Sequence, residues 1–318
     1  MSRPQWLAGV GLALLATVST GALASPAQAA STGKAYVQTG GKVWYKAATG
    51  KTNKVVITLS GNTVTIDDRV AIKAGAGCKK VKGDKTKVRC TAKVKLVSVR
   101  VYLRDGNDTL VNKSTLSLAG DGGSGKDKIT GGEGRDTLWG GAGADILRGV
   151  GGIDFIYGDV SNAGATGGDV RREGGNDTIY GGDGNDYIEA NAGPNTIYGQ
   201  AGNDEIHGST GADLVYAGAG NDSFWDYGGA DRVHGNSGND VLRGGPGNDH
   251  LYGEAGNDTL FGEGGSDRIY GHAGDDELYG ADGTATGVAD QLDGGTNGTA
   301  AGDGCLALEN DVRLNCER

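Results

Sequence analysis

"GGPGNDHLYGEAGNDTLFGEGGSD", residues 244–267, repeats a Gly-rich run three times, and each run ends in an aspartate. The whole chain has 63 glycines among 318 residues, a content well above that of ordinary globular domains. Such a composition leaves a low-complexity tail, a collagen-like fibre or a repeat architecture. Because the glycines follow no strict three-residue period, a collagen-like fibre is excluded.

The quoted stretch belongs to a nine-residue period that extends over much of the chain. Aspartates follow this period over 127–154, 177–186 and 204–276, and Asn195 holds the one register position that lacks a carboxylate. A glycine stands two residues before each of these sixteen positions, and an apolar residue stands two residues after each. Each unit therefore has the pattern G-G-x-G-x-D-x-U-x, in which U is apolar.

This period predicts an all-β fold, a parallel β-roll or β-helix solenoid with two units in each 18-residue coil. The six Gly-rich residues of a unit form a turn, and the other three form a short strand. One apolar side chain per unit cannot make a core alone, but coiling stacks these side chains into two internal rows. The period breaks after Asp154 and Asp276, and we expect the extra residues, around 159–172 and 281–289, to loop outward.

The same coiling places the aspartates in two rows, with Asp240, Asp258 and Asp276 along one edge. Carboxylates about 4.8 Å apart would repel one another by roughly 3–4 kcal/mol per neighbouring pair. Cations between the carboxylates would remove this repulsion. Carboxylate and carbonyl oxygens suit a hard cation with irregular coordination, so Ca²⁺ is the expected ion. The alternative is that the aspartates only form turns, which they can do without a metal.

The motif recurs from about Gly122 to Leu292 and resembles the nonapeptide of the RTX, or haemolysin-type, calcium-binding repeat proteins. This resemblance implies a parallel β-roll in which aspartates of neighbouring coils and turn carbonyls hold several Ca²⁺ ions. The ligands that it implies are Asp127, Asp136, Asp145, Asp154, Asp177, Asp186, Asp204, Asp213, Asp222, Asp231, Asp240, Asp249, Asp258, Asp267 and Asp276.

Three units depart from the pattern. Asn195 lacks the charge, and Pro194 lies beside it, so we expect this site to be weak or absent. The units with Asp226-Tyr227 and Arg172-Glu173 in place of the double glycine are doubtful calcium sites.

The N-terminus has the features of a secretory signal peptide. Arg3 is followed by an apolar stretch and by Ala27-Gln28-Ala29, a small-x-small cleavage pattern. A single membrane anchor is the alternative, although polar residues interrupt the apolar stretch. We therefore expect a secreted, extracellular protein with no membrane span.

The four cysteines form two pairs that are close in sequence. In an exported protein they are expected to form disulfides, and among the three possible connectivities we favour Cys78–Cys90 and Cys305–Cys316. The spacing of these cysteines does not fit a zinc site.

The charge distribution separates two regions. Residues 31–104 carry 17 Lys/Arg and 3 Asp/Glu, whereas 105–318 carry 12 Lys/Arg and 37 Asp/Glu. The acidic part favours cations and excludes nucleic acid as a partner. The basic part has alternating apolar and polar residues, which predicts strands, and it resembles the leader of secreted actinobacterial calcium-binding repeat proteins.

The expected organisation has four parts. They are a signal peptide (1–29), a basic β-rich region that leads into or caps the roll (30–104), the calcium-binding roll (105–293) and a C-terminal disulfide cap (294–318).

The chain contains no GxSxG, HExxH or nucleotide-binding motif, so we expect a calcium-binding protein rather than an enzyme. One alternative is a cell-envelope adhesin or structural protein, in which the lysines contact cell-wall polymer or a tyrosine row binds glycan. A calcium-dependent enzyme that acts on polysaccharide is a further alternative.

Overall fold

The computed structural model describes residues 32–159, 175–281, 289–297, 303–306 and 311–316. All of them belong to the unit Thr32–Arg318. The predicted signal peptide lies outside the described residues. Within the described part every regular element is a β-strand, and no helix there is long and apolar enough to cross a membrane.

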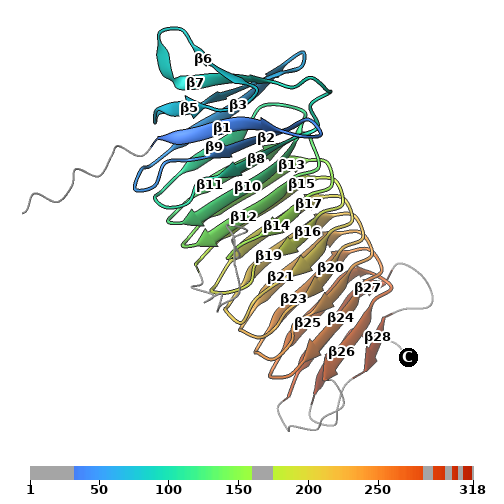
Figure 1. Cartoon of the computed structure of the whole chain (residues 1–318). Coiled ribbons are helices and arrows are strands. Elements are labelled where there is room, and N and C mark those ends of the chain that lie inside the picture. The colour runs from blue at the N-terminus through green and yellow to red at the C-terminus, as the bar shows by residue number, and fades with distance from the viewer. Residues whose placement is uncertain (1–31, 160–174, 282–288, 298–302, 307–310, 317–318) are drawn as a thin grey trace, which may run out of the picture. The chain divides into compact units, whose positions relative to one another are not determined.

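The strands form two sheets, and alternate strands along the roll belong to opposite sheets (Figure 1). The first sheet holds, in spatial order, β28 (Gly304–Leu306), β26 (Glu277–Ala281), β24 (Thr259–Glu263), β22 (Val241–Arg243), β20 (Ser223–Trp225), β18 (Glu205–His207), β16 (Tyr187–Glu189), β14 (Phe155–Tyr157), β12 (Thr137–Ala142), β10 (Ser117–Ser124), β8 (Ser98–Tyr102), β2 (Lys42–Lys46), β1 (Gly33–Gln38) and β5 (Ile72–Ala74). The second sheet holds β29 (Val312–Leu314), β27 (Gln291–Asn297), β25 (Arg268–Gly274), β23 (His250–Ala255), β21 (Arg232–Ser237), β19 (Leu214–Ala219), β17 (Thr196–Ala201), β15 (Thr178–Asp183), β13 (Ile146–Gly151), β11 (Lys128–Gly132), β9 (Thr109–Asn112), β3 (Lys54–Ser60), β4 (Thr63–Asp67), β7 (Asp84–Thr91) and β6 (Cys78–Val81).

Neighbouring strands of the roll are parallel and are shifted by one coil. Leu242 pairs with Leu260, and Leu251 pairs with Ile269, each 18 residues further along the chain. The predicted all-β, parallel roll with 18 residues per coil is therefore confirmed.

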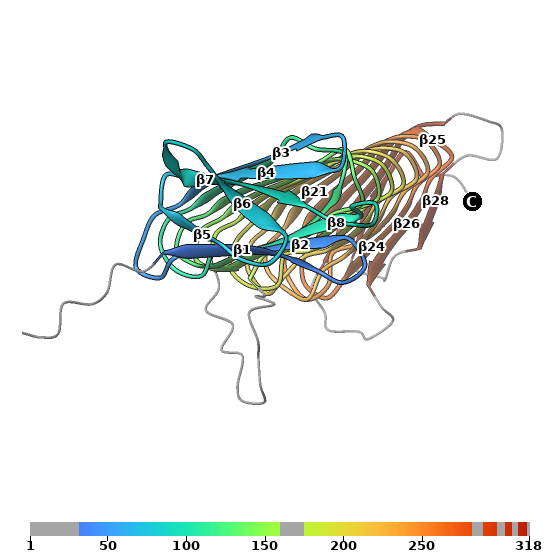
Figure 2. The same cartoon turned by 45° about the horizontal axis from the view of Figure 1, so that its top comes forward.

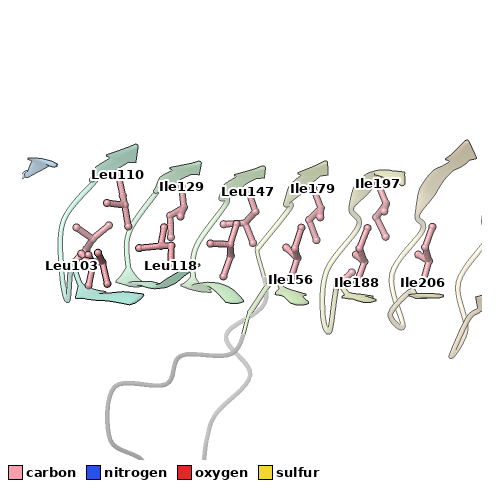
Figure 3. Packing of buried hydrophobic residues seen from close by; sticks show 14 of the residues in the cluster. Leu103, Leu110, Leu118, Ile129, Leu147, Ile156, Ile179, Ile188, Ile197 and Ile206 are labelled. Carbon is pink, nitrogen blue, oxygen red and sulfur yellow. The ribbon is translucent and has the colours of Figure 1, made fainter. Parts of the chain in front are cut away.

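The apolar residue of each unit points into the space between the two sheets. Figure 3 shows Leu147 and Ile179 on one side of this space and Ile156 and Ile188 on the other. All four side chains are fully buried. The narrow core is thus two facing rows of single aliphatic side chains, as the sequence pattern predicts.

The fourth position of the motif is glycine for two reasons, which Gly143 illustrates. Its φ is +128°, a conformation that L side chains rarely adopt. In addition, a Cβ on Gly143 would overlap the backbone carbonyl of Gly125 in the preceding coil. The second position also has positive φ in many units but accepts other residues, such as Gln200 with φ +83°. Close contact between coils therefore fixes the glycine at position 4.

The basic N-terminal region continues the sheets of the roll. Strand β2 pairs with β8 and β3 pairs with β9, both in parallel. Strands β4, β7 and β6 add to the second sheet by antiparallel pairing, and a disulfide between Cys78 and Cys90 joins β6 to β7. Figure 2 shows these strands at the N-terminal end of the two sheets.

A second disulfide joins the C-terminal strands of the two sheets. Cys305 lies in β28 and Cys316 follows β29. Cys305 also takes the core position that pairs with Leu278. The two predicted cysteine pairs are both present.

The extra residues at the two breaks of the period lie mostly outside the described residues. On either side of the first break the sheet continues, because β13 pairs directly with β15. Across the second break β25 pairs directly with β27.

Candidate metal sites along two aspartate rows

The fold places the fifteen predicted ligands in two rows, one beside each sheet. In each row, the backbone N–H of one aspartate donates to Oδ1 of the row member in the next coil, as from Asp240 to Asp258 at 2.8 Å. The first row contains Asp136, Asp154, Asp186, Asp204, Asp222, Asp240, Asp258 and Asp276. The second row contains Asp127, Asp145, Asp177, Asn195, Asp213, Asp231, Asp249 and Asp267.

The second carboxylate oxygen of these aspartates has no partner. In all fifteen, Oδ2 is buried and accepts no hydrogen bond, while the residue as a whole is at most 3% exposed. Leaving one buried polar group unsatisfied costs about 1–3 kcal/mol, and more when the group is charged. Fifteen such groups would cost on the order of 15–45 kcal/mol, which exceeds the 5–15 kcal/mol of net stability of a typical domain. The roll therefore needs either protons or cations on these oxygens.

At several row positions, Oδ2 and a backbone carbonyl oxygen of the next coil both lie near the first glycine of the motif. A Cβ on Gly181 would lie 2.6 Å from Oδ2 of Asp186 and 2.5 Å from the carbonyl oxygen of Gly199 in the next coil. The same arrangement recurs at Gly262, where Oδ2 of Asp267 is 2.5 Å from this point. The first glycine of the motif thus leaves room for a carboxylate oxygen and a carbonyl oxygen to approach the same place. The glycine itself offers Oδ2 only C–H groups, and these are too weak as hydrogen-bond donors to satisfy an ionised carboxylate.

Burial raises the pKa of the row aspartates. Desolvation is the largest cause, and the donated backbone N–H offsets part of it. The pKa of Asp136 and Asp249 rises to about 8, that of Asp240 and Asp258 to about 7, and that of Asp154 to about 6. Without a cation, the folded roll therefore holds protons on carboxyl groups that would be ionised in water.

The donor set of the rows fits a hard cation. Each row offers carboxylate oxygens from successive coils and backbone carbonyl oxygens of the turns, which are the ligands that Ca²⁺ accepts. A divalent cation would supply the positive charge that the unpartnered Oδ2 atoms need nearby.

Asn195 shows what the row does without the charge. Its Oδ1 accepts the N–H of Asp177 at 2.9 Å, just as an aspartate would. Its Nδ2 takes the place of the Oδ2 of an aspartate and donates to the carbonyl of Gly193 at 2.7 Å. This atom is therefore hydrogen-bonded, unlike the Oδ2 atoms of the row aspartates. This pairing is the physical reason to expect a weak or absent site at Asn195, which stays a prediction.

Sequence analysis missed members at the ends of the rows. Asp108 donates its N–H to Oδ1 of Asp127 at 2.7 Å, and the half-repeat Asp105-Gly106-Asn107-Asp108 was the signal. Asp290 and Asp303 extend the other ends by accepting N–H bonds from Asp267 and Asp276. Their irregular spacing hid them from a nine-residue count.

Sequence analysis also missed a buried carboxylate group. Asp213, Asp226 and Asp231 bring one oxygen each to within 4.8 Å of one another, and all three are buried. The unit with Asp226-Tyr227 was predicted to be a doubtful calcium site, yet it adds a third carboxylate to the second row. The other doubtful pair, Arg172-Glu173, lies outside the described residues.

The outer face of the second sheet carries a row of stacked rings. Ring centroids are 4.9 Å apart between Tyr180 and Tyr198, and 5.3 Å apart between Tyr198 and Tyr216. His234 continues the stack, at 4.8 Å from Tyr216 and 4.7 Å from Tyr252. The row therefore consists of cross-strand stacked pairs, and such pairs stabilise a thin sheet.

Comparison with known families identifies the repeat. Residues 121–158, 173–197, 189–224, 225–260 and 252–286 match the family model described as RTX calcium-binding nonapeptide repeat (4 copies). No curated protein matches the chain at a significant level.

Proposed function

This chain is an RTX calcium-binding repeat protein, and from that premise we propose that it is secreted, is not an enzyme, and folds as several Ca²⁺ ions enter its two aspartate rows. The observation that carries the proposal is the set of fifteen buried Oδ2 atoms without a hydrogen-bond partner. Ca²⁺ would supply the positive charge beside these oxygen atoms, for which the described residues offer no hydrogen-bond donor. Because the core has one apolar side chain per unit, the bound ions supply a large share of the folding free energy.

Two measurements test calcium-coupled folding. Far-UV circular dichroism should show a large loss of β-signal when excess chelator is added to the mature chain, with part of the N-terminal structure remaining. A calorimetric titration should give on the order of ten Ca²⁺ per chain. A full β-signal in chelator, or a stoichiometry near one, would contradict the proposal.

The proposed export rests on the disulfides and on the predicted signal peptide. Both disulfides close short loops, and such bonds persist in oxidising compartments. Expression of the full chain should place the protein in the culture medium, with a mature N-terminus just after Ala29. A chain that is retained in the cell and uncleaved would contradict export.

A second candidate function, binding to an anionic cell-envelope polymer, is favoured by a cleft at the β6–β7 hairpin. The cleft has a volume of about 810 Å³, and its lining includes Lys79, Lys80, Lys82 and Arg89. Lys87 lies nearby in β7 but is not part of this lining, and its Nζ forms an ion pair with Oδ2 of Asp67 at 2.9 Å.

The test replaces the four cleft cations by glutamine and keeps Lys87 as a matched control, replaced alone in a second variant. Retention on cell-wall material at physiological salt should fall in the fourfold variant and remain in the control. No retention of the wild type would remove this function and leave calcium binding unaffected.

The proposal contains no catalytic step. Burial is the largest cause of the raised pKa values of the row carboxyl groups, and this cause requires no substrate. A screen with acidic polysaccharides in the presence of calcium should show no cleavage, and any turnover would contradict the proposal.

A further inference from the structure

Asp226 occupies a position that the motif reserves for glycine. It stands five residues before Asp231, where most other units have the first glycine of the pattern and two have alanine. At the regular units, the carbonyl oxygen of this position lies beside the first glycine of the preceding coil, as Gly199 does beside Gly181. Beside Gly208 that place is taken by Oδ1 of Asp226. A carboxyl oxygen of a side chain therefore lies where the regular units have a backbone carbonyl oxygen as the near atom.

The carboxylate of Asp226 is directed at the unpaired oxygens of the second row. A Cβ on Gly208 would meet both Oδ1 of Asp226 and Oδ2 of Asp213, the latter at 3.0 Å. Oxygens of Asp213, Asp226 and Asp231 all lie within 4.8 Å of one another. Oδ2 of Asp213 and Oδ2 of Asp231 are buried and unpartnered, in residues that are 3% and 2% exposed.

The remaining oxygens of the group are already held by backbone donors. Asp226 accepts N–H bonds from Ser209 at 3.1 Å and from Gly228 at 2.6 Å. Oδ1 of Asp213 accepts the N–H of Asn195 at 2.7 Å, and Oδ1 of Asp231 accepts the N–H of Asp213 at 2.7 Å. These bonds fix the three carboxylates in place before any ligand arrives.

Among the ion pairs between described residues, none involves any of the three carboxylates. Asn195, the preceding member of the row, is neutral and offers no positive charge to Asp213. Three fixed carboxylates with two unpaired oxygens form a site for a divalent cation that is richer in charge than a regular row position.

We infer that Asp213 and Asp231, two members of the second row, share one Ca²⁺ site with Asp226, a ligand outside the repeat motif, and that this site fills before the regular row sites. The inference rests on the proposed function, since it ranks one site among calcium sites of the same roll. The affinity of a calcium site rises with the number of charged ligands and with their prior rigidity, and this group has both.

The test uses the full mature chain and three variants. Asp226→Asn removes the charge and keeps the shape, and Asp226→Gly restores the residue that the motif has at this position. Asp222→Asn is the matched control, because Asp222 lies in the neighbouring unit but in the opposite row. Each protein is equilibrated in calcium buffers of decreasing free Ca²⁺, and the bound calcium per chain is measured by atomic absorption.

The wild type should retain about one ion at a free Ca²⁺ at which the regular sites are empty. Both Asp226 variants should lose this last ion at a free Ca²⁺ about tenfold higher or more, and the Asp222 variant should retain it. If both Asp226 variants keep the last ion as the wild type does, the inference is overturned while the proposed function stands. Stabilisation of Asp226→Asn in chelator with unchanged calcium retention would show a proton shared with Asp231, which also overturns it. A wild type that binds no calcium at all would instead refute the proposed function.

Discussion

Replacing one row aspartate by asparagine should change stability in opposite directions with and without calcium. Asp240 is a regular row member: its Oδ1 accepts the N–H of Asp222 at 2.8 Å, and its Oδ2 is buried and unpartnered. Asparagine keeps the acceptor and, by analogy with Asn195, offers its Nδ2 to the carbonyl two residues earlier. The natural Asn195 makes this bond to Gly193 at 2.7 Å.

The expected changes in stability, one in chelator and one in calcium, both follow from the loss of one carboxylate charge. In chelator, Asp240→Asn removes an unsatisfied buried oxygen and should stabilise the roll by about 1–3 kcal/mol. In calcium at a hundredfold excess over the dissociation constant, one site contributes about 2.7 kcal/mol, and the variant should lose up to about that amount. The reciprocal variant, Asn195→Asp, should show the reverse pattern.

The assay is urea unfolding followed by far-UV circular dichroism at pH 7.5, in millimolar calcium and in excess chelator. If the wild type is unfolded in chelator, the same concentration of trimethylamine N-oxide is added to every protein, since this osmolyte favours burial. Shifts of the same sign in both conditions would refute the reasoning. Stabilisation in both would mean that the aspartate acts only as a turn former, since asparagine keeps the acceptor oxygen and removes the unsatisfied one.

Three further outcomes follow from the same structure. In chelator, the pKa of row aspartates such as Asp240 is raised to about 7 from 3.8, so folding takes up protons; stability should be highest near pH 4 and should fall as the pH rises to about 8, which urea midpoints measured across this range would check. Gly143→Ala should destabilise the calcium-loaded roll by more than about 2 kcal/mol, because it adds a Cβ against the preceding coil at positive φ, whereas Gln200→Ala should change stability by less than about 0.5 kcal/mol in the same urea experiment. Tyr216→Ala removes two stacked contacts and should cost about 1–3 kcal/mol, while Tyr216→Phe keeps the ring and should lower the unfolding midpoint only slightly.

The sequence predicted the rows because the features that build them are local. The turn glycines, the aspartate and the apolar residue occur within one unit, and an 18-residue coil then aligns equivalent residues such as Leu242 and Leu260. The different roles of the two carboxylate oxygens could not be predicted from the sequence, because the N–H group that donates to Oδ1 comes from the neighbouring coil. Only the folded register shows that one oxygen of Asp258 is satisfied by Asp240 and the other is left over.

The rest depends on contacts that a repeat pattern does not contain. Asp226 departs from the motif, and a sequence comparison reads the departure as a defect. Its meaning comes from the position of its side chain beside Gly208 and Asp213, two residues of the preceding coil. Alternating apolar and polar residues in the basic region predicted strands, but a two-residue period does not indicate which strands pair with each other or in which direction. The antiparallel addition of β4, β7 and β6 therefore had to come from the structure.

The choice between a turn-forming role and a metal-binding role can be argued from a single pair of residues. A turn former needs only an oxygen that accepts the N–H of the neighbouring coil, and Asn195 does this as well as Asp240 does. Asparagine would also spare the roll an unpaired buried oxygen at every unit. Yet the row positions carry fifteen aspartates and one asparagine, so the chain accepts a cost that the hydrogen bond does not require. That cost is recovered only when a cation occupies the row, and the fold of the roll is then conditional on the ion that it binds.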